Sequence, residues 1–266
     1  MKILAMVLAL VLLLAGCAMM KTPVVEETKP QPWVMPQSLY QPEDFVLVGD
    51  FLQCTTGSTV VGVDVSSHQG RIDWKLVAAS GVKFAFIRLG YRGYGNGSLN
   101  EDAYAQENLA GAKAAGLKVG AYFFSQAVDA QEAREEADYA LEILNGFALD
   151  LPLVFDWEYI SLEARTGTVG RTTLTEATVA FCDAVKEAGY GPMVYFNTNQ
   201  GRFRLKLEAL AGYSWWLAKY DMESAFLCKA DLWQYTDQGS VPGINGNVDI
   251  DLMFTDYGLG KEIFGG

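Results

Sequence analysis

The sequence predicts an α/β barrel of eight strands and about five helices, modified in its last part. Eight short runs of apolar, β-branched and aromatic residues recur along the chain, as is typical of strands. Helical segments fill the gaps between the first runs, and this alternation favours a closed sheet. After the sixth run the connections are short and carry no clear helix, so we expect that the last strands do not all run parallel.

The expected elements follow one another in a regular order. The strands cover residues 60–65, 84–89, 119–125, 153–158, 193–198, 215–220, 232–236 and 248–254. The helices cover residues 74–80, 101–115, 130–145 and 174–188, with a shorter one over 203–210. Capping-box spacing predicts two of the helix starts, Asp129 with Glu132 and Thr173 with Glu176.

The N-terminus predicts export. Lys2 precedes an apolar run over residues 3–14, which is too short to span a bilayer as a stable helix and is typical of a signal peptide. The run ends in Leu14-Ala15-Gly16-Cys17, which resembles the lipobox of bacterial lipoproteins. We therefore expect residues 1–16 to be removed and Cys17 to carry a lipid that anchors the chain to a bacterial membrane, facing the cell wall. An ordinary secretory signal cleaved near Ala18 is the alternative.

Residues 17–58 are expected to form an extended tether. Prolines recur in this segment and apolar periodicity is weak, so it cannot bury enough surface to fold alone. Its apolar residues 45–48 predict either a short strand or an arm packed on the domain. Residues 59–257 suit a single domain with a sizeable core, and residues 258–266 are expected to be a C-terminal tail.

The composition excludes several classes of function. A net charge of −12 argues against nucleic acid, because phosphate binding requires clustered Lys and Arg. It would also repel anionic wall polymers, so a long glycan would be held by stacking and hydrogen bonds. Besides Cys17 the chain has Cys54, Cys182 and Cys228, an odd remainder that cannot all pair within one molecule. No Cys-x-x-Cys spacing suggests zinc, and no cofactor is expected.

Two carboxylates end the fourth expected strand. Because side chains alternate across a strand, Asp156 and Glu158 should point to the same side. Two like charges held this close raise at least one pKa, which suits acid-assisted glycoside hydrolysis. The alternative is a solvated strand end at which acidic residues merely cap the sheet.

Other carboxylates are expected at the same mouth of the barrel. Asp64 lies near the end of the first strand, where parallel barrels gather their chemistry. Asp249 and Asp251 lie near the start of the last strand, so they reach this mouth only if that strand runs opposite to the first five. Carboxylates in this number can bind a hard cation, but nothing in their spacing requires one, and no metal is expected.

Several segments, taken in order, resemble the family 25 glycoside hydrolases, the Chalaropsis-type lysozymes. They are residues 62–70, 120–124, 155–158, 216–220, 232–235 and 246–249, which together span nearly the whole domain. The resemblance implies a flattened TIM-like barrel. It also implies that the partner is the glycan strand of peptidoglycan, cleaved at the β-1,4 bond between N-acetylmuramic acid and N-acetylglucosamine. With a lipid anchor, such an enzyme would serve local cell-wall remodelling.

The resemblance also implies roles for the acidic residues. Glu158 would be the general acid, with a pKa raised by Asp156. Asp156 would either stabilise the positive charge that develops on the sugar or orient the substrate's N-acetyl group. Asp64 and Asp249 would shape the electrostatics of the cleft or act as structural caps. His68, the only histidine, would be a positioning residue near the mouth.

Aromatic side chains near the strand ends are expected to hold sugar rings. They are Tyr122, Phe124, Tyr195, Trp216 and Trp233.

The chain departs from the family pattern at two positions. Phe123 stands where histidine is common, which would shift substrate preference, and Asp251 stands where asparagine is common, which would raise neighbouring pKa values. Two other functions stay open. The chain could be a catalytically silent lipoprotein that binds cell-wall glycan, or a hydrolase of another N-acetylated glycan.

Overall fold

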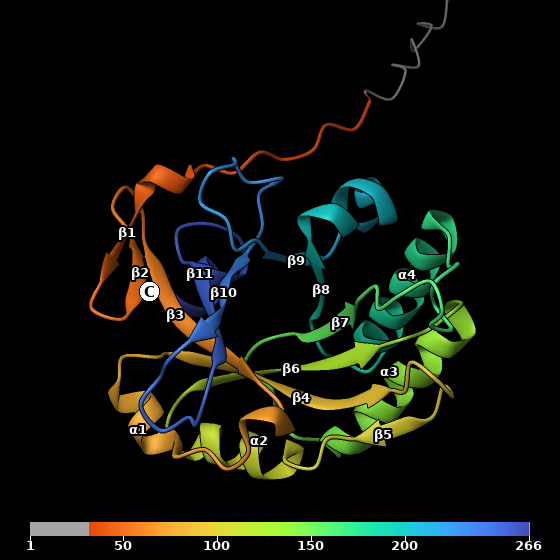
Figure 1. Cartoon of the computed structure of the whole chain (residues 1–266), viewed down its shortest axis with the longest axis horizontal. Coiled ribbons are helices and arrows are strands. Elements are labelled where there is room, and N and C mark those ends of the chain that lie inside the picture. The colour runs from red at the N-terminus through yellow and green to blue at the C-terminus, as the bar shows by residue number, and fades with distance from the viewer. Residues whose placement is uncertain (1–31, 266) are drawn as a thin grey trace, which may run out of the picture. The chain divides into compact units, whose positions relative to one another are not determined.

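The computed structural model describes residues 32–265, and the chain from Val34 onward forms one compact unit (Figure 1). The expected signal peptide, Cys17 and the first part of the expected tether lie outside the described residues. No helix among residues 32–265 is long and apolar enough to cross a bilayer.

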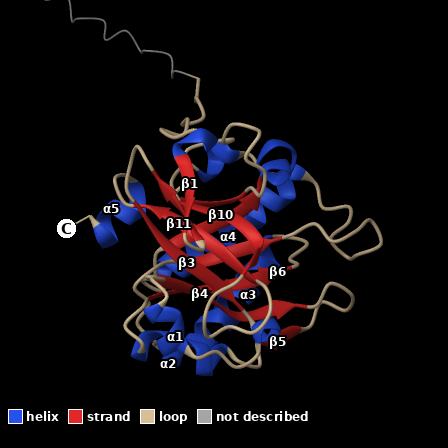
Figure 2. Cartoon of the chain, turned by 60° about the vertical axis from the view of Figure 1, so that its left-hand side comes forward, coloured by secondary structure: helices blue, strands red, loops and turns tan. Residues whose placement is uncertain are grey.

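Eight strands close into a barrel, as the sequence predicts (Figures 1 and 2). They are β3 (Thr59–Val65), β4 (Phe84–Arg92), β6 (Lys118–Ser125), β7 (Leu153–Trp157), β8 (Pro192–Asn197), β9 (Ser214–Ala218), β10 (Leu232–Gly239) and β11 (Val248–Phe254). Neighbours from β3 to β10 run parallel, whereas β11 runs antiparallel to both β10 and β3. The short strand β5 (Leu99–Glu101) adds to the edge of β4.

Helices cover the outside of the first part of the barrel. They are α1 (Trp74–Ala79), α2 (Ala105–Ala114), α3 (Ala130–Leu144) and α4 (Arg171–Glu187). The Asp129 side chain accepts a hydrogen bond from the backbone N–H of Glu132 over 2.9 Å, which confirms the predicted start of α3. The predicted Thr173 cap is wrong, because α4 begins at Arg171 after Gly170.

Three further segments differ from expectation. The expected helix over 203–210 is instead a π-helix, Gln200–Arg204, followed by a 3-10 turn, Leu207–Leu210. Most of the expected tail forms α5 (Gly258–Phe264). Single 3-10 turns also occur at Pro42–Asp44 and Ser67–Gln69.

Part of the expected tether packs on the barrel. The strands β1 (Phe45–Val48) and β2 (Phe51–Cys54) form an antiparallel hairpin. The buried ring of Phe45 lies 4.9 Å from that of Trp233, and the ring of Tyr40 stacks at 5.2 Å on Phe254. Residues 45–48 are therefore both a strand and a packed arm, and the packed unit begins before residue 59.

The inward positions of the strands run continuously from the core to the mouth. Phe84 and Phe86 are fully buried, and Arg88, two residues further along β4, reaches the mouth. Glycine leaves room for these rings, since a Cβ at Gly62 would lie 2.1 Å from Phe84 and one at Gly120 would lie 2.4 Å from Phe86. The core thus sits directly beneath the polar mouth of the barrel.

Candidate active site

A cavity of about 340 Å³ opens where the parallel strands end. It contains all four carboxylates predicted as site residues and four of the five predicted aromatic side chains. The lining residues are Asp64, Ser66, His68, Gln69, Arg88, Tyr122, Phe124, Asp156, Glu158, Tyr195, Trp216, Tyr220, Gln234, Asp237 and Asp249.

Strand direction explains how residues far apart in sequence meet here. Asp156 and Glu158 lie two positions apart at the end of β7 and line the same cavity. Because β11 is reversed, its first residues lie at the mouth, and Asp249 pairs in register with Asp64 of β3. The last strand thus runs opposite to the first five, which is the predicted condition for Asp249 to share a mouth with Asp64.

Asp156 and Glu158 form a coupled acidic pair. Burial raises the pKa of Asp156, the charge of Glu158 raises it further, and Arg88 opposes this shift. Burial also raises the pKa of Glu158, which makes desolvation, rather than the expected push from Asp156, the main cause. Arg88 favours an ionised Asp156, whereas burial favours a proton on either carboxyl group, so the two carboxyl groups titrate as a pair.

Gln234 is the centre of a hydrogen-bond network on the other side of the cavity. Its Nε2 donates to Asp64 Oδ2 over 2.7 Å, and its Oε1 accepts from Tyr195 over 2.9 Å and from Tyr220 over 2.7 Å. Nearby, burial, followed by the charges of Asp237 and Glu158, raises the pKa of Asp249 to about 6. This network fixes the carboxylate of Asp64 in a largely desolvated position.

Arg88 is the only arginine or lysine among the residues that line the cavity. Its Nε donates to Asp102 Oδ2 over 2.8 Å, and its Nη2 donates to Ser67 Oγ over 3.1 Å. Arg88 and Gln234 were not among the predicted site residues, although Gln234 lies in the family-like segment 232–235. The signal for Arg88 was a lone charged side chain within the apolar run over residues 84–89.

Two glutamine side chains hold the backbone carbonyls of Trp157 and Glu158. Gln126 Nε2 donates to the carbonyl of Glu158 over 2.8 Å, and Gln200 Nε2 donates to the carbonyl of Trp157. Thr166 Oγ1 in turn donates to Gln126 Oε1 over 2.8 Å. These contacts fix the end of β7 without involving either carboxylate.

The predicted site residue Trp233 points away from the cavity, and so does Phe123, one of the two departures from the family pattern. Trp233 is buried on the outer face of β10, where it packs on Phe45 and donates to the carbonyl of Lys219 over 2.7 Å. The prediction that Trp233 binds substrate is wrong, because its neighbour Gln234 takes the inward position. Phe123 likewise faces outward and meets the ring of Tyr139 at 6.3 Å, so it cannot alter substrate preference by direct contact.

His68 lies in the 3-10 turn at the mouth and lines the cavity, where the sequence placed it. Ser66 Oγ accepts from the backbone N–H of His68 over 3.2 Å and thus caps this turn. Among residues 32–265 no group of three or more His, Cys, Asp or Glu side chains has the arrangement of a metal site. The absence of a metal stays a prediction.

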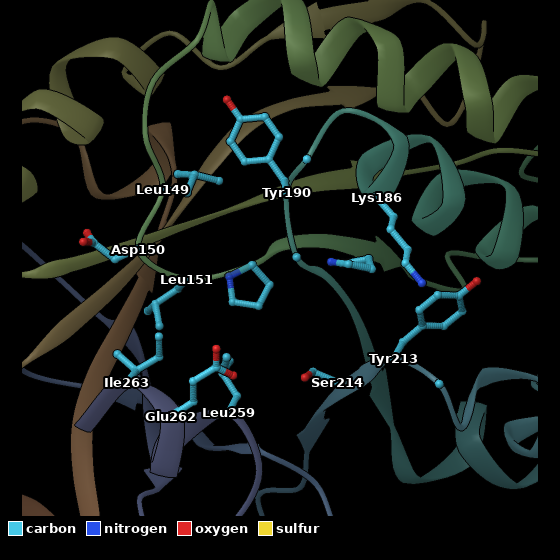
Figure 3. A pocket seen from close by; sticks show the side chains of 15 residues that line it. Leu149, Asp150, Leu151, Lys186, Tyr190, Tyr213, Ser214, Leu259, Glu262 and Ile263 are labelled. Atoms are coloured by element: carbon cyan, nitrogen blue, oxygen red, sulfur yellow. The ribbon is translucent and has the colours of Figure 1, made fainter. Parts of the chain in front are cut away.

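A second cavity, of about 390 Å³, lies at the opposite end of the barrel (Figure 3). It is formed where β7, β8 and β9 begin and by one side of α5. Asp150, Lys186, Tyr190, Tyr213 and Glu262 supply most of its polar side chains. None of the predicted site residues lies there, and it has no coupled acidic pair, so the first cavity is the candidate active site.

Comparison with known proteins agrees with this geometry. The model of the family described as Glycosyl hydrolases family 25 matches residues 63–244. The autolytic lysozyme of Clostridium acetobutylicum is 28% identical over 193 residues, which are 71% of this chain and 54% of that protein. The chain thus spans about half the length of this relative.

Two solved structures have a similar fold. The modular autolysin LytC from Streptococcus pneumoniae, in complex with a synthetic peptidoglycan ligand, has a TM-score of 0.64 and 27% identity, covering 74% of this chain and 47% of that one. The bacterial lysozyme from Streptomyces coelicolor has a TM-score of 0.62 and 25% identity, covering 77% of this chain and 94% of that one.

Proposed function

The chain belongs to glycosyl hydrolase family 25, and from this premise we propose that it hydrolyses the glycan strands of peptidoglycan. The bond cleaved is the β-1,4 bond between N-acetylmuramic acid and N-acetylglucosamine. The observation that carries the proposal is the coupled pair Asp156 and Glu158, held side by side in a cavity at the mouth of the barrel.

Glu158 is the general acid. It is half-buried, so its pKa is raised while its carboxyl group still reaches the cavity. It gives its proton to the glycosidic oxygen as the bond from that oxygen to the sugar C1 breaks, and water completes the hydrolysis at C1. A general acid of this kind contributes roughly 10²–10⁴-fold to the rate.

Asp156 is the second carboxylate. It is 6% exposed, and its Oδ1 has no hydrogen-bond donor among the described residues. Where this carboxylate faces the cavity, it is suited to accept the N–H of the substrate's N-acetyl group. The ionised carboxylate also stabilises the positive charge that develops on the sugar ring.

The aromatic lining holds the sugar rings. Tyr122, Phe124, Tyr195 and Trp216 line the cavity, where sugar rings would contact them, while Asp64 and Asp249 set its charge and hydrogen bonding. A panel that compares peptidoglycan with chitin oligosaccharides tests the substrate class. Release of products from peptidoglycan alone supports the proposal. Equal hydrolysis of chitin favours another N-acetylated glycan as substrate, and binding without hydrolysis favours a silent wall-binding protein.

The proposal includes the cellular location. The signal sequence and the lipobox around Cys17 support export and anchoring through a lipid, which would confine the enzyme to wall remodelling near the membrane. Fractionation of cells that express the chain with and without Cys17→Ser tests this. We expect the chain with Cys17 in the membrane fraction and the variant in the soluble or secreted fraction. Active chain with an intact Cys17 mainly in the culture supernatant would contradict anchoring.

A further inference from the structure

Two neighbouring segments form the edge of the candidate active site beside Glu158. They are the loop that follows β7 and the π-helix that follows β8, two adjacent strands of the barrel (Figure 1). In the π-helix, Gln200 Nε2 donates to the carbonyl of Trp157. The guanidinium carbon of Arg204 lies 4.5 Å from the centre of the Tyr159 ring. The π-helix therefore lies directly against the residues that precede and follow Glu158.

The π-helix is firmly packed, and it turns Arg202 and Phe203 toward solvent. The backbone N–H of Gln200 donates to Asn197 Oδ1 over 3.0 Å, and the backbone N–H of Asn197 donates to Gln200 Oε1 over 3.0 Å. A Cβ at Gly201 would lie 2.6 Å from the side chain of Leu227, so the backbone packs closely on the loop after β9. In contrast, Arg202 is exposed and Phe203 is 68% exposed. These two side chains contribute little to the packing of the helix that carries them.

The loop after β7 presents further apolar side chains to solvent. Tyr159 and Ile160 are exposed, and Leu162 is 70% exposed. Single exposed apolar side chains are common, but a group of them beside a cavity marks an interaction site. Because the Tyr159 ring contacts Arg204, the loop and the π-helix meet, and we call residues 159–162 and 202–204 together the outer rim.

The outer rim is positive, whereas the cavity is negative. Five carboxylates line the cavity, and Arg88 is the one arginine or lysine among its lining residues. The outer rim contains two arginines and no carboxylate. Neither Arg202 nor Arg204 forms an ion pair with a described residue, and this includes Glu163, which follows the rim in sequence. A carboxylate on the substrate is therefore repelled from the cavity and attracted to the rim.

Peptidoglycan has the distribution of charge that fits this arrangement. Its sugars are uncharged where the lactyl group of muramic acid is joined by an amide bond to the stem peptide. The free carboxylates lie on that peptide, which branches from the glycan and has to leave the cavity over its edge. The peptide also carries aliphatic side chains, which suit exposed apolar residues. Arginine binds a carboxylate through two parallel N–H donors.

We propose that the outer rim binds the stem peptide of the substrate, with Arg202 paired to a stem carboxylate and Phe203 packed on the aliphatic side chains. Arg204 is a positioning residue, because its guanidinium holds the Tyr159 ring and its Nη1 donates to the carbonyl of Val169 over 3.1 Å. This inference rests on the proposed function and extends it. The enzyme then selects its substrate by the peptide as well as by the sugars.

The first test compares two soluble substrates that differ only in charge. One is a glycan strand with ionised stem peptides, and the other is the same strand after its stem carboxyl groups have been converted to amides. We expect kcat/KM of the wild type to be about threefold to fivefold higher on the ionised strand, because an exposed ion pair contributes up to about this factor. The difference should lie mainly in KM, since the contact is made equally in the ground state and in the transition state. Equal kcat/KM on both strands would overturn the proposal.

Variants assign this preference to the outer rim. In Arg202→Gln the ratio of the two kcat/KM values should fall toward one. Phe203→Ser should lower kcat/KM on both strands alike, because its contacts do not depend on charge. Lys75→Gln, which removes an exposed cation on α1, should keep the ratio of the wild type and serves as the control. The same ratio in Arg202→Gln as in the wild type would show that Arg202 does not bind the stem.

Binding measures the same contact without hydrolysis. In calorimetric titrations, Glu158→Gln should bind the ionised strand about threefold to fivefold more tightly than the amidated one, and the double variant Glu158→Gln with Arg202→Gln should bind both equally. If the wild type hydrolyses neither strand, the proposed function fails, and these titrations still decide the role of the rim. An effect of Arg202→Gln that appears only on walls bearing phosphate polymers, and not on the purified strands, would overturn the proposal in favour of a phosphate partner.

Discussion

Gln126 donates a hydrogen bond from Nε2 to the backbone carbonyl of Glu158 over 2.8 Å, and so ties the loop after β6 to the candidate acid. The backbone N–H of Gln126 donates to Glu136 Oε1 over 3.2 Å, and Arg92 Nε donates to the same oxygen over 2.8 Å. A buried ion pair between β4 and α3 thus supports the position of Glu158 from outside the cavity. The acid is held through its backbone, which leaves its carboxyl group free.

Gln126→Met should lower kcat while the fold persists. Methionine has a similar length but cannot donate to the carbonyl of Glu158, and displacement of a catalytic group by about 1 Å costs up to roughly 10²-fold. We expect a loss of about tenfold to a hundredfold in kcat with a smaller change in KM. Steady-state kinetics on soluble peptidoglycan fragments measures this, with Gln131→Met on the exposed side of α3 as the control. Equal kcat for both variants would show that Gln126 does not position Glu158.

The N-terminal hairpin should contribute to stability. Phe45 is buried against Trp233, Phe226 and Phe254, and truncation of a buried phenylalanine costs about 3–5 kcal/mol. At about 3 kcal/mol, Phe45→Ala should lower the melting temperature by roughly 6–12 °C. Leu47→Ala, on the same strand but exposed, should change it little. A similar melting temperature for both variants would favour the expected tether over a packed arm.

The order and type of most elements could be predicted because hydrophobic runs and helix signals alternate along the chain. The direction of the last strand could not be predicted outright, because short connections permit an antiparallel strand without requiring one. The packing of the hairpin that begins at residue 45 could not be predicted for a different reason. Its burial depends on Trp233 and Phe254, whose outward direction is set by the register of distant strands.

Site residues could be predicted where they belong to a local sequence motif. They could not be predicted where contacts between distant parts of the chain determine their position. Asp156 and Glu158 follow from alternation along a single strand. Trp233 was misplaced because a one-residue difference moves a side chain to the opposite face of a strand. The role of Gln126 depends on its contact with Glu158, 32 positions away in the chain, which no local pattern reveals.

Asp249→Asn should stabilise the protein only at higher pH. The pKa of Asp249 is raised to about 6 in the folded state, mainly by burial. Its contribution is fully present below about pH 4 and is lost as the pH rises through about 6. After allowance for solvent screening, the gain is about 1 kcal/mol, or roughly 2–4 °C, at pH values above about 6.

Melting curves at about pH 4 and about pH 7.5 measure this difference. Asp50→Asn, in the exposed turn of the hairpin, changes the same charge outside the cavity and serves as the control. A gain for Asp249→Asn of the same size at both pH values would show that burial does not raise the pKa of Asp249.

The most direct test of the central claim uses the chain that begins at Ala18, together with its Glu158→Gln and Glu142→Gln variants. Each protein is incubated with peptidoglycan, and mass spectrometry identifies the reducing ends that are released. We predict new muramic acid reducing ends from the wild type and from Glu142→Gln, whose substitution lies on the exposed face of α3, and at least about a hundredfold fewer from Glu158→Gln. Muramic acid ends released by Glu158→Gln at the rate of the wild type, or N-acetylglucosamine ends released by the wild type, would contradict the account.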